Sequence, residues 1–161
     1  MTNGHKDAQE LFARLGQSKG FEVRRTYSQS LHSDGIWLVR DPIYPLKKIP
    51  MASIEVIVSE STKSMRGSIG ILEEISPAVA IILLQEEEIR KRNIKNGVEY
   101  DSIENEINCR LQFIKEQTSK STQRFEVWSM RYLRTLLLRH KKVNEETKTS
   151  FPRPNNAHPA R

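Results

Sequence analysis

A continuous apolar run at residues 78–84 limits the possible folds more than any other stretch of the chain. Its seven residues, Ala-Val-Ala-Ile-Ile-Leu-Leu, include no polar side chain. The run is short for a helix, and its β-branched residues favour a strand that is buried on both faces. Such strands occur in sheets that helices cover on both sides. We therefore expect an α/β fold with this strand at the centre of the sheet.

The segments before this run predict the elements that surround it. Apolar spacing indicates helices at residues 5–18 and 62–74, and alternation indicates strands at residues 21–27, 34–40 and 52–59. Three prolines make residues 41–50 a loop. Gly67 and Gly70 weaken the second helix, which favours close packing of that helix on the sheet. The predicted order is α-β-β-β-α-β, with a mixed sheet of about four strands.

The remainder of the chain is predicted to be helical. Residues 86–95 form a charged helix, a second helix begins near Asp101, and a third covers residues 122–139. We interpret residues 1–142 as a single domain, with an α/β core at 5–84 and a helical extension at 85–142. Residues 143–161 contain too little apolar surface to pack and are predicted to be a disordered basic tail.

The positive charge is concentrated near the end of the domain. The chain carries a net charge of +6, and residues 121–142 hold six basic side chains against one acid, Glu126. A local excess of this kind is expected of a nucleic-acid surface. The predicted DNA-contacting residues are Lys47 and Lys48 in the proline-rich loop, with Arg124, Arg131, Arg134, Lys141 and Lys142 further on. The alternatives are a solvated helix face and a solvated loop that discourages edge pairing.

Several classes of protein are disfavoured by what the sequence lacks. No apolar run approaches the ~20 residues of a membrane helix, and the first residues do not resemble a signal peptide. The single cysteine, Cys109, excludes an internal disulfide and fits a cytoplasmic setting. There is no glycine loop that would cradle a phosphate, so no nucleotide cofactor is expected.

Two acidic residues accompany the predicted strands on either side of the proline-rich loop. Asp34 precedes the apolar residues of the first strand, and Glu55 lies inside the second, on the face that also carries Ser53. Acids are unfavourable in apolar strands unless they are solvated, paired or bound to a metal. Two of them on neighbouring strands predict a shared divalent cation. The alternatives are a turn closed by Asp34 and a salt bridge from Glu55 to Arg25.

This arrangement resembles the PD-(D/E)XK nuclease superfamily, which includes restriction endonucleases and Holliday-junction resolvases. Ser33-Asp34 is similar to its first half-motif, and Ile54-Glu55-Val56-Ile57 to its second. The resemblance covers residues 5–84 and implies a restriction-endonuclease-like core. It also implies that Asp34 and Glu55 bind Mg²⁺ or Mn²⁺, which activates water for phosphodiester hydrolysis.

The sequence departs from the family at one position. The family's lysine belongs two residues after the second acid, where this chain has Ile57. Lys63, at the start of the next helix, is the expected replacement, with Arg66 behind it. Glu10 is similar to an additional metal-binding acid of some members, and Ser53 is a further accessory candidate.

The resemblance leads to two hypotheses on function. The first is a Mg²⁺-dependent DNA endonuclease that acts as a homodimer, with Asp34, Glu55 and Lys63 as catalytic residues. The second is a catalytically inactive DNA-binding or assembly module on the same fold, which Ile57 favours. A third hypothesis, without nucleic acid, is a protein-interaction domain whose charge serves solubility.

Overall fold

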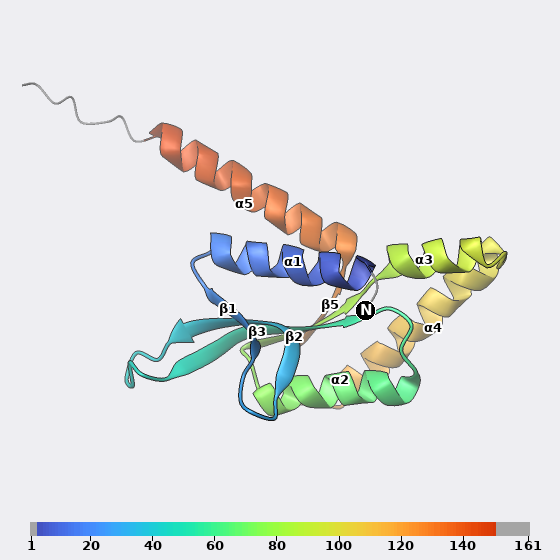
Figure 1. Cartoon of the computed structure of the whole chain (residues 1–161), viewed down its shortest axis with the longest axis horizontal. Coiled ribbons are helices and arrows are strands. Elements are labelled where there is room, and N and C mark those ends of the chain that lie inside the picture. The colour runs from blue at the N-terminus through green and yellow to red at the C-terminus, as the bar shows by residue number, and fades with distance from the viewer. Residues whose placement is uncertain (1–2, 151–161) are drawn as a thin grey trace, which may run out of the picture.

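The computed structural model describes residues 3–150, with side chains through residue 145, and forms a mixed sheet with helices on both faces (Figure 1). Within this range there are five helices: α1 (Asn3–Ser18), α2 (Thr62–Ile75), α3 (Glu86–Lys95), α4 (Tyr100–Thr118) and α5 (Met130–Ser150). The sheet has five strands: β1 (Glu22–Thr26), β2 (His32–Arg40), β3 (Lys48–Ile57), β4 (Val79–Leu84) and β5 (Phe125–Ser129). The prediction of an α/β fold is confirmed.

The strands follow one another across the sheet in chain order, β1-β2-β3-β4-β5. The first three are antiparallel, whereas β3, β4 and β5 are parallel. The apolar run forms β4, which has a strand on each side and is almost entirely buried. Its prediction as a buried central strand is therefore confirmed.

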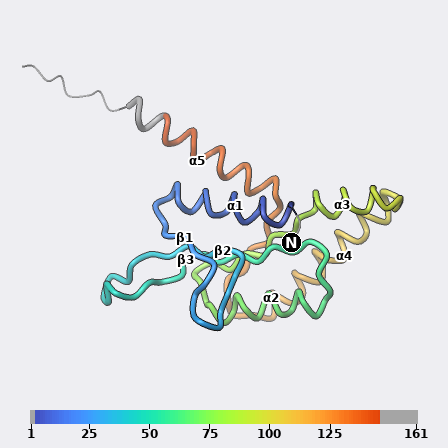
Figure 2. The backbone as a smooth tube through the Cα atoms, viewed as in Figure 1, coloured from blue at the N-terminus to red at the C-terminus, as the bar shows by residue number. Residues whose placement is uncertain are grey.

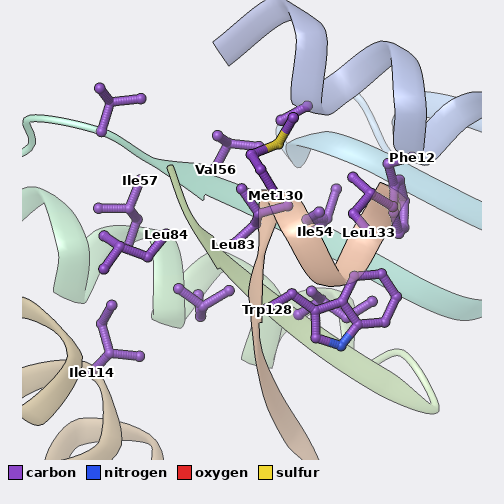
Figure 3. Packing of buried hydrophobic residues seen from close by; sticks show 14 of the residues in the cluster. Phe12, Ile54, Val56, Ile57, Leu83, Leu84, Ile114, Trp128, Met130 and Leu133 are labelled. Carbon is purple, nitrogen blue, oxygen red and sulfur yellow. The ribbon is translucent and has the colours of Figure 1, made fainter. Parts of the chain in front are cut away.

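Helices cover the two faces of the sheet in pairs. Helices α1 and α5 pack together above the sheet in Figure 1, and α2 lies below it with α4 against it. The core on the upper side centres on Phe12, whose ring stacks on Trp37 at a centroid distance of 4.4 Å. Figure 3 shows Phe12 beside Leu133 of α5 and Ile54 of β3, so that face joins both helices to the sheet. No helix among residues 3–150 combines the length and apolar content required to cross a membrane.

The prediction for residues 122–139 was wrong in its first part. Residues 125–129 form β5, which pairs with β4 in parallel register, for example Val127 with Ile82. The apolar residues of this short strand and of the helix after it together match the spacing of one helical stripe. A brief apolar run does not distinguish the strand period of two residues from the helix period of about 3.6. The sheet therefore has five strands instead of about four, and the second half of the chain is not purely helical.

Two predicted boundaries also need correction. Strand β3 begins at Lys48 and includes Pro50, which pairs with Leu38 beside a register shift. A bulge tolerates proline because a ladder hydrogen bond is already disturbed there. Helix α5 runs to Ser150, so residues 143–150 are not a disordered tail. Polar residues continue a helix that has already formed, since elongation is much easier than nucleation. Residues 151–161 lie outside the described residues.

Close packing occurs at glycines other than the two predicted in α2. A Cβ atom on Gly67 or Gly70 would meet nothing within 4 Å, and both residues are exposed. A Cβ atom on Gly16 of α1 would instead lie 2.3 Å from Nε1 of Trp37. The same indole nitrogen donates a hydrogen bond to the Phe12 carbonyl at 3.1 Å. Helix α1 therefore touches the Trp37 ring directly, and Gly16 allows the approach.

We expect Gly16→Ala to destabilise the protein by about 1–3 kcal/mol, because the added methyl group overlaps Trp37. Gly70→Ala is the matched control in another helix. It should stabilise the protein by up to about 1 kcal/mol, because alanine favours an exposed helical position. Urea unfolding followed by circular dichroism measures both. A Gly16→Ala protein as stable as the wild type would contradict this packing.

Candidate functional site

Asp34 and Glu55 lie on neighbouring antiparallel strands. The last residue pair between β2 and β3 on this side is Gly35 with Ile54. If the strands continued to alternate regularly, Asp34 would lie opposite Glu55 and share its face of the sheet. Gly35 faces Phe12 of α1, so regular alternation would turn Asp34 toward the opposite helix, α2. The structure departs from this pattern at Asp34.

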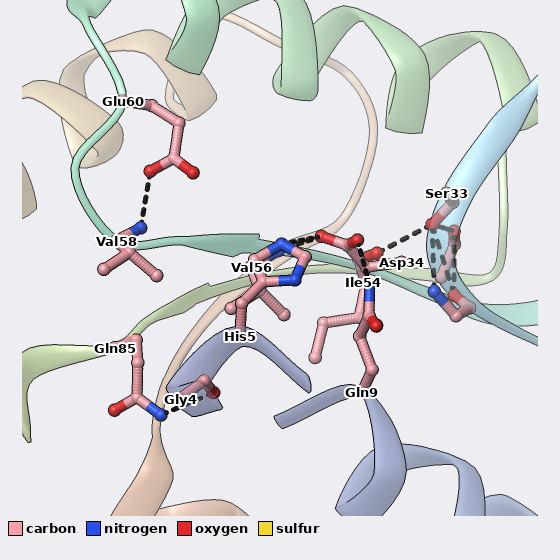
Figure 4. Close-up of polar contacts among 12 residues, drawn as sticks. Gly4, His5, Gln9, Ser33, Asp34, Ile54, Val56, Val58, Glu60 and Gln85 are labelled. Carbon is pink, nitrogen blue, oxygen red and sulfur yellow. Dashed lines mark hydrogen bonds and ion pairs between the residues drawn. The ribbon is translucent and has the colours of Figure 1, made fainter. Parts of the chain in front are cut away.

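The Asp34 carboxylate is held from the α1 side (Figure 4). Its Oδ1 accepts a hydrogen bond from Gln9 Nε2 at 2.5 Å, and its Oδ2 lies 3.2 Å from His5 Nε2. The backbone amide of Val56 also donates to Oδ2, at 2.8 Å. Burial opposes ionisation, but the hydrogen bonds from His5 and Val56 outweigh it and lower the pKa of Asp34. The hydrogen bond to Asp34 in turn raises the pKa of His5.

These contacts give Asp34 a structural role in the sheet. Pairing between β2 and β3 stops at Ile54, so the Val56 amide has no backbone partner on β2. An unpaired buried amide costs free energy, and the Asp34 side chain supplies the missing acceptor. The carboxylate therefore extends the β2–β3 ladder by one hydrogen bond and ties it to α1.

Glu55 is held on the α2 side of the sheet. The residue is 9% exposed, and its carboxylate accepts hydrogen bonds from the Ser68 hydroxyl of α2, from the Asp34 amide and from the Ser33 hydroxyl. Ser33 Oγ also lies 2.8 Å from Ser53 Oγ, so Ser53 belongs to this buried polar group. Burial and then the charge of Asp34 raise the pKa of Glu55 to about 7. Near neutral pH a large fraction of Glu55 is therefore protonated.

The metal pair of Asp34 and Glu55 stays a prediction from the sequence, and the structure gives the two carboxylates different neighbours. Helices on opposite faces of the sheet engage the two carboxylates, through Gln9 and His5 for Asp34 and through Ser68 for Glu55. A shared Mg²⁺ ion requires oxygen ligands at about 2.1 Å in a nearly octahedral arrangement, with both carboxylates ionised. A metal ion shared by the two residues would have to replace the hydrogen bonds to Asp34 and the proton on Glu55. Among the described residues, no group of three or more acids, histidines or cysteines could hold a metal ion.

The remaining candidates for a nuclease site lie elsewhere. Ile57 is completely buried, so the position of the family's lysine belongs to the core. Lys63 is exposed in the first turn of α2, and Arg66 lies over the Phe113 ring at 5.5 Å from its centroid. Glu10 is exposed on α1. The side chain of α2 that reaches Glu55 is Ser68, which sequence reasoning missed.

Sequence reasoning also missed His5 and Gln9, although α1 contains a signal for them. The two residues are four positions apart, and Phe12 and Gly16 continue the same stripe toward the sheet. Two polar side chains on the buried stripe of a helix predict buried partners. The sequence prediction considered only the apolar residues of the helix, so it did not include His5 and Gln9 in the buried face.

The predicted basic residues occupy several surfaces. Arg124 pairs with Glu126 on β5, and Arg134 pairs with Glu87 across to α3. Lys48 contacts Glu22 on β1. Lys47 belongs to the loop between β2 and β3, and the predicted residues on α5 that are exposed are Arg131, Arg134, Lys141 and Lys142. Lys141 also lines a pocket between α1 and α5 together with Arg14.

Comparison with protein-family models, with curated proteins and with solved structures found no match to this chain.

The raised pKa of Glu55 makes stability depend on pH. A proton held in the folded state stabilises the fold fully below the unfolded pKa of about 4.5, and this contribution is lost as the pH rises through about 7. The full loss is about 3 kcal/mol. We expect Glu55→Gln, which stays neutral, to remove this part of the decline between about pH 5 and pH 8. Urea unfolding across this interval measures the change.

The experiment must separate the contribution of His5 and needs a control variant. His5 has a raised pKa and produces a decline of the same sign around and above pH 6.5, which the Glu55→Gln variant retains. Glu74→Gln, an exposed position on the same helix as Ser68, is the matched control. A wild-type free energy of unfolding that rises from pH 5 to 8 would contradict the burial of Glu55. So would a Glu74→Gln variant whose pH dependence changes as much as that of Glu55→Gln.

Proposed function

We propose that this chain is a non-catalytic nucleic-acid-binding module built on a restriction-endonuclease-like core. The element order α-β-β-β-α-β, with an acid on β2 and another on β3, supports the likeness to the PD-(D/E)XK nucleases. The observation that carries the choice of a binding module over an enzyme is that helices on opposite faces of the sheet hold the two carboxylates. A homodimer, a cytoplasmic location and dependence on Mg²⁺ stay predictions from the sequence.

Helix α5 is the surface that we assign to the nucleic acid. Its first thirteen residues, from Met130 to Lys142, contain five arginines and lysines and no acid. His140 contacts the Ser18 carbonyl at the end of α1, and beyond this contact α5 projects past the domain (Figure 1). Lys141 and Lys142 are both exposed, Lys141 beside the end of α1 and Lys142 immediately after it. A projecting basic helix can approach phosphates of a duplex without obstruction from the sheet.

We expect the protein to bind duplex DNA with an affinity that falls linearly with the logarithm of salt concentration. Replacing Lys141 and Lys142 with glutamate should weaken binding at least tenfold and reduce the magnitude of the salt slope by roughly 2, because two phosphate contacts are lost. Fluorescence anisotropy of a labelled duplex measures both quantities. The matched control is Lys91→Glu with Lys95→Glu, the same charge change at exposed positions of α3.

The same material separates binding from cleavage. Supercoiled plasmid incubated with the wild type and Mg²⁺ or Mn²⁺ should remain intact while duplex binding is retained. Metal-dependent nicking that disappears in Asp34→Ala would overturn the non-catalytic assignment and restore the nuclease hypothesis. Equal weakening by the α3 and α5 variants would show that net charge, and not α5, determines binding.

A further inference from the structure

The loop between β2 and β3 exposes an unusual amount of apolar surface. Figure 2 shows this loop projecting from the sheet at the end away from α3. Leu46 is 100% exposed, Ile43 75% and Tyr44 58%. Single exposed apolar side chains are common, but three within five residues form a patch that indicates an interaction.

Hydrogen bonds fix the shape of this loop before any partner binds. The Asp41 carboxylate accepts from the amides of Ile43 and Tyr44, at 2.7 and 3.0 Å. Backbone hydrogen bonds join Lys47 to Tyr44 and Asp41 to Lys47. The exposed side chains are thus held by an ordered turn, which reduces the entropy that binding would otherwise cost.

Beside the loop lies a hollow of about 410 Å³, within the size range of ligand sites. Its apolar lining comes from Tyr27, Leu38 and Leu46, and its basic lining from Arg24, Lys47 and Lys48. Glu22 contacts both Arg24 and Lys48, but its single negative charge is smaller than the three positive charges of the basic residues. The Lys47 ammonium lies 4.9 Å from the centroid of the Tyr44 ring. We call this site the hairpin hollow.

We propose that the hairpin hollow binds an unpaired nucleotide, with its base against Tyr27 and Leu46 and its phosphate beside Lys47 and Arg24. An aromatic and apolar wall with cations at its rim matches the flat base and the charged backbone of a single strand. A paired base offers no free face, because its neighbours in the duplex cover both faces. An anionic membrane would engage the projecting tip at Ile43 and Tyr44, whereas the basic residues of the hairpin hollow lie beside it in a concavity with Tyr27. This inference extends the proposed nucleic-acid binding and rests on it.

The test uses an oligothymidine of about 20 nucleotides that contains 4-thiothymidine, together with a duplex of equal length. Tyr27→Ala combined with Leu46→Ala should weaken single-strand binding at least about fivefold and leave duplex binding unchanged within about twofold. Photocrosslinks mapped by mass spectrometry should fall on the hairpin hollow. The control, Ile94→Ala with Tyr100→Ala, removes comparable exposed side chains from α3 and α4 and should change neither affinity.

The outcomes distinguish this inference from the proposed function. Equal single-strand affinities of the wild type and the hollow variant, with duplex binding intact, would overturn the hairpin hollow alone. A wild type that binds neither oligothymidine nor duplex would overturn both proposals. Binding to vesicles that contain phosphatidylserine tests whether the loop contacts a membrane instead. Vesicle binding that the hollow variant loses, without any loss of single-strand binding, would assign the loop to a membrane and contradict the inference.

Discussion

The burial of β4 on both faces is the constraint on which the rest of the structure depends. Its side chains are apolar on both sides, so each face of the sheet must be covered by helices. Helices α1 and α5 cover one face, and α2 with α4 covers the other. A buried carboxylate on β2 or β3 must then find hydrogen-bond partners in the sheet or in one of these two layers, as Asp34 does in α1 and Glu55 in α2.

This constraint explains the different fates of the two acids. The Val56 amide, His5 and Gln9 together draw the Asp34 carboxylate to the α1 layer, where it stays ionised. Glu55 remains in the α2 layer among serine hydroxyls, where burial favours its proton. Different helices thus hold the two acids of the predicted metal pair, while the charge of Asp34 still raises the pKa of Glu55. The interactions that we propose use the basic helix α5 and the hairpin hollow.

The sequence predicted a helix or strand correctly wherever the same spacing of apolar residues extended over the whole element. Residues 78–84 and the stripes of α1 and α2 predicted their elements within a few residues. The strand β5 was missed because its apolar residues continue into the stripe of α5. The orientation of Asp34 could not be predicted, because regular alternation would have placed it beside Glu55 on one face of the sheet. The turn of Asp34 toward α1 depends on the unpaired Val56 amide, a tertiary feature that no local pattern of the sequence contains.

The separation of the two carboxylates is tested most directly by their response to a paramagnetic metal. Mn²⁺ titrated into ¹⁵N-labelled protein broadens the amide signals of residues close to any bound ion. Under the proposal of a non-catalytic module, we expect no selective broadening at Asp34 and Glu55 up to millimolar Mn²⁺, because helices on opposite faces of the sheet hold the two carboxylates. Saturable broadening of both amides that is abolished by Asp34→Asn would contradict the account and establish a shared metal site.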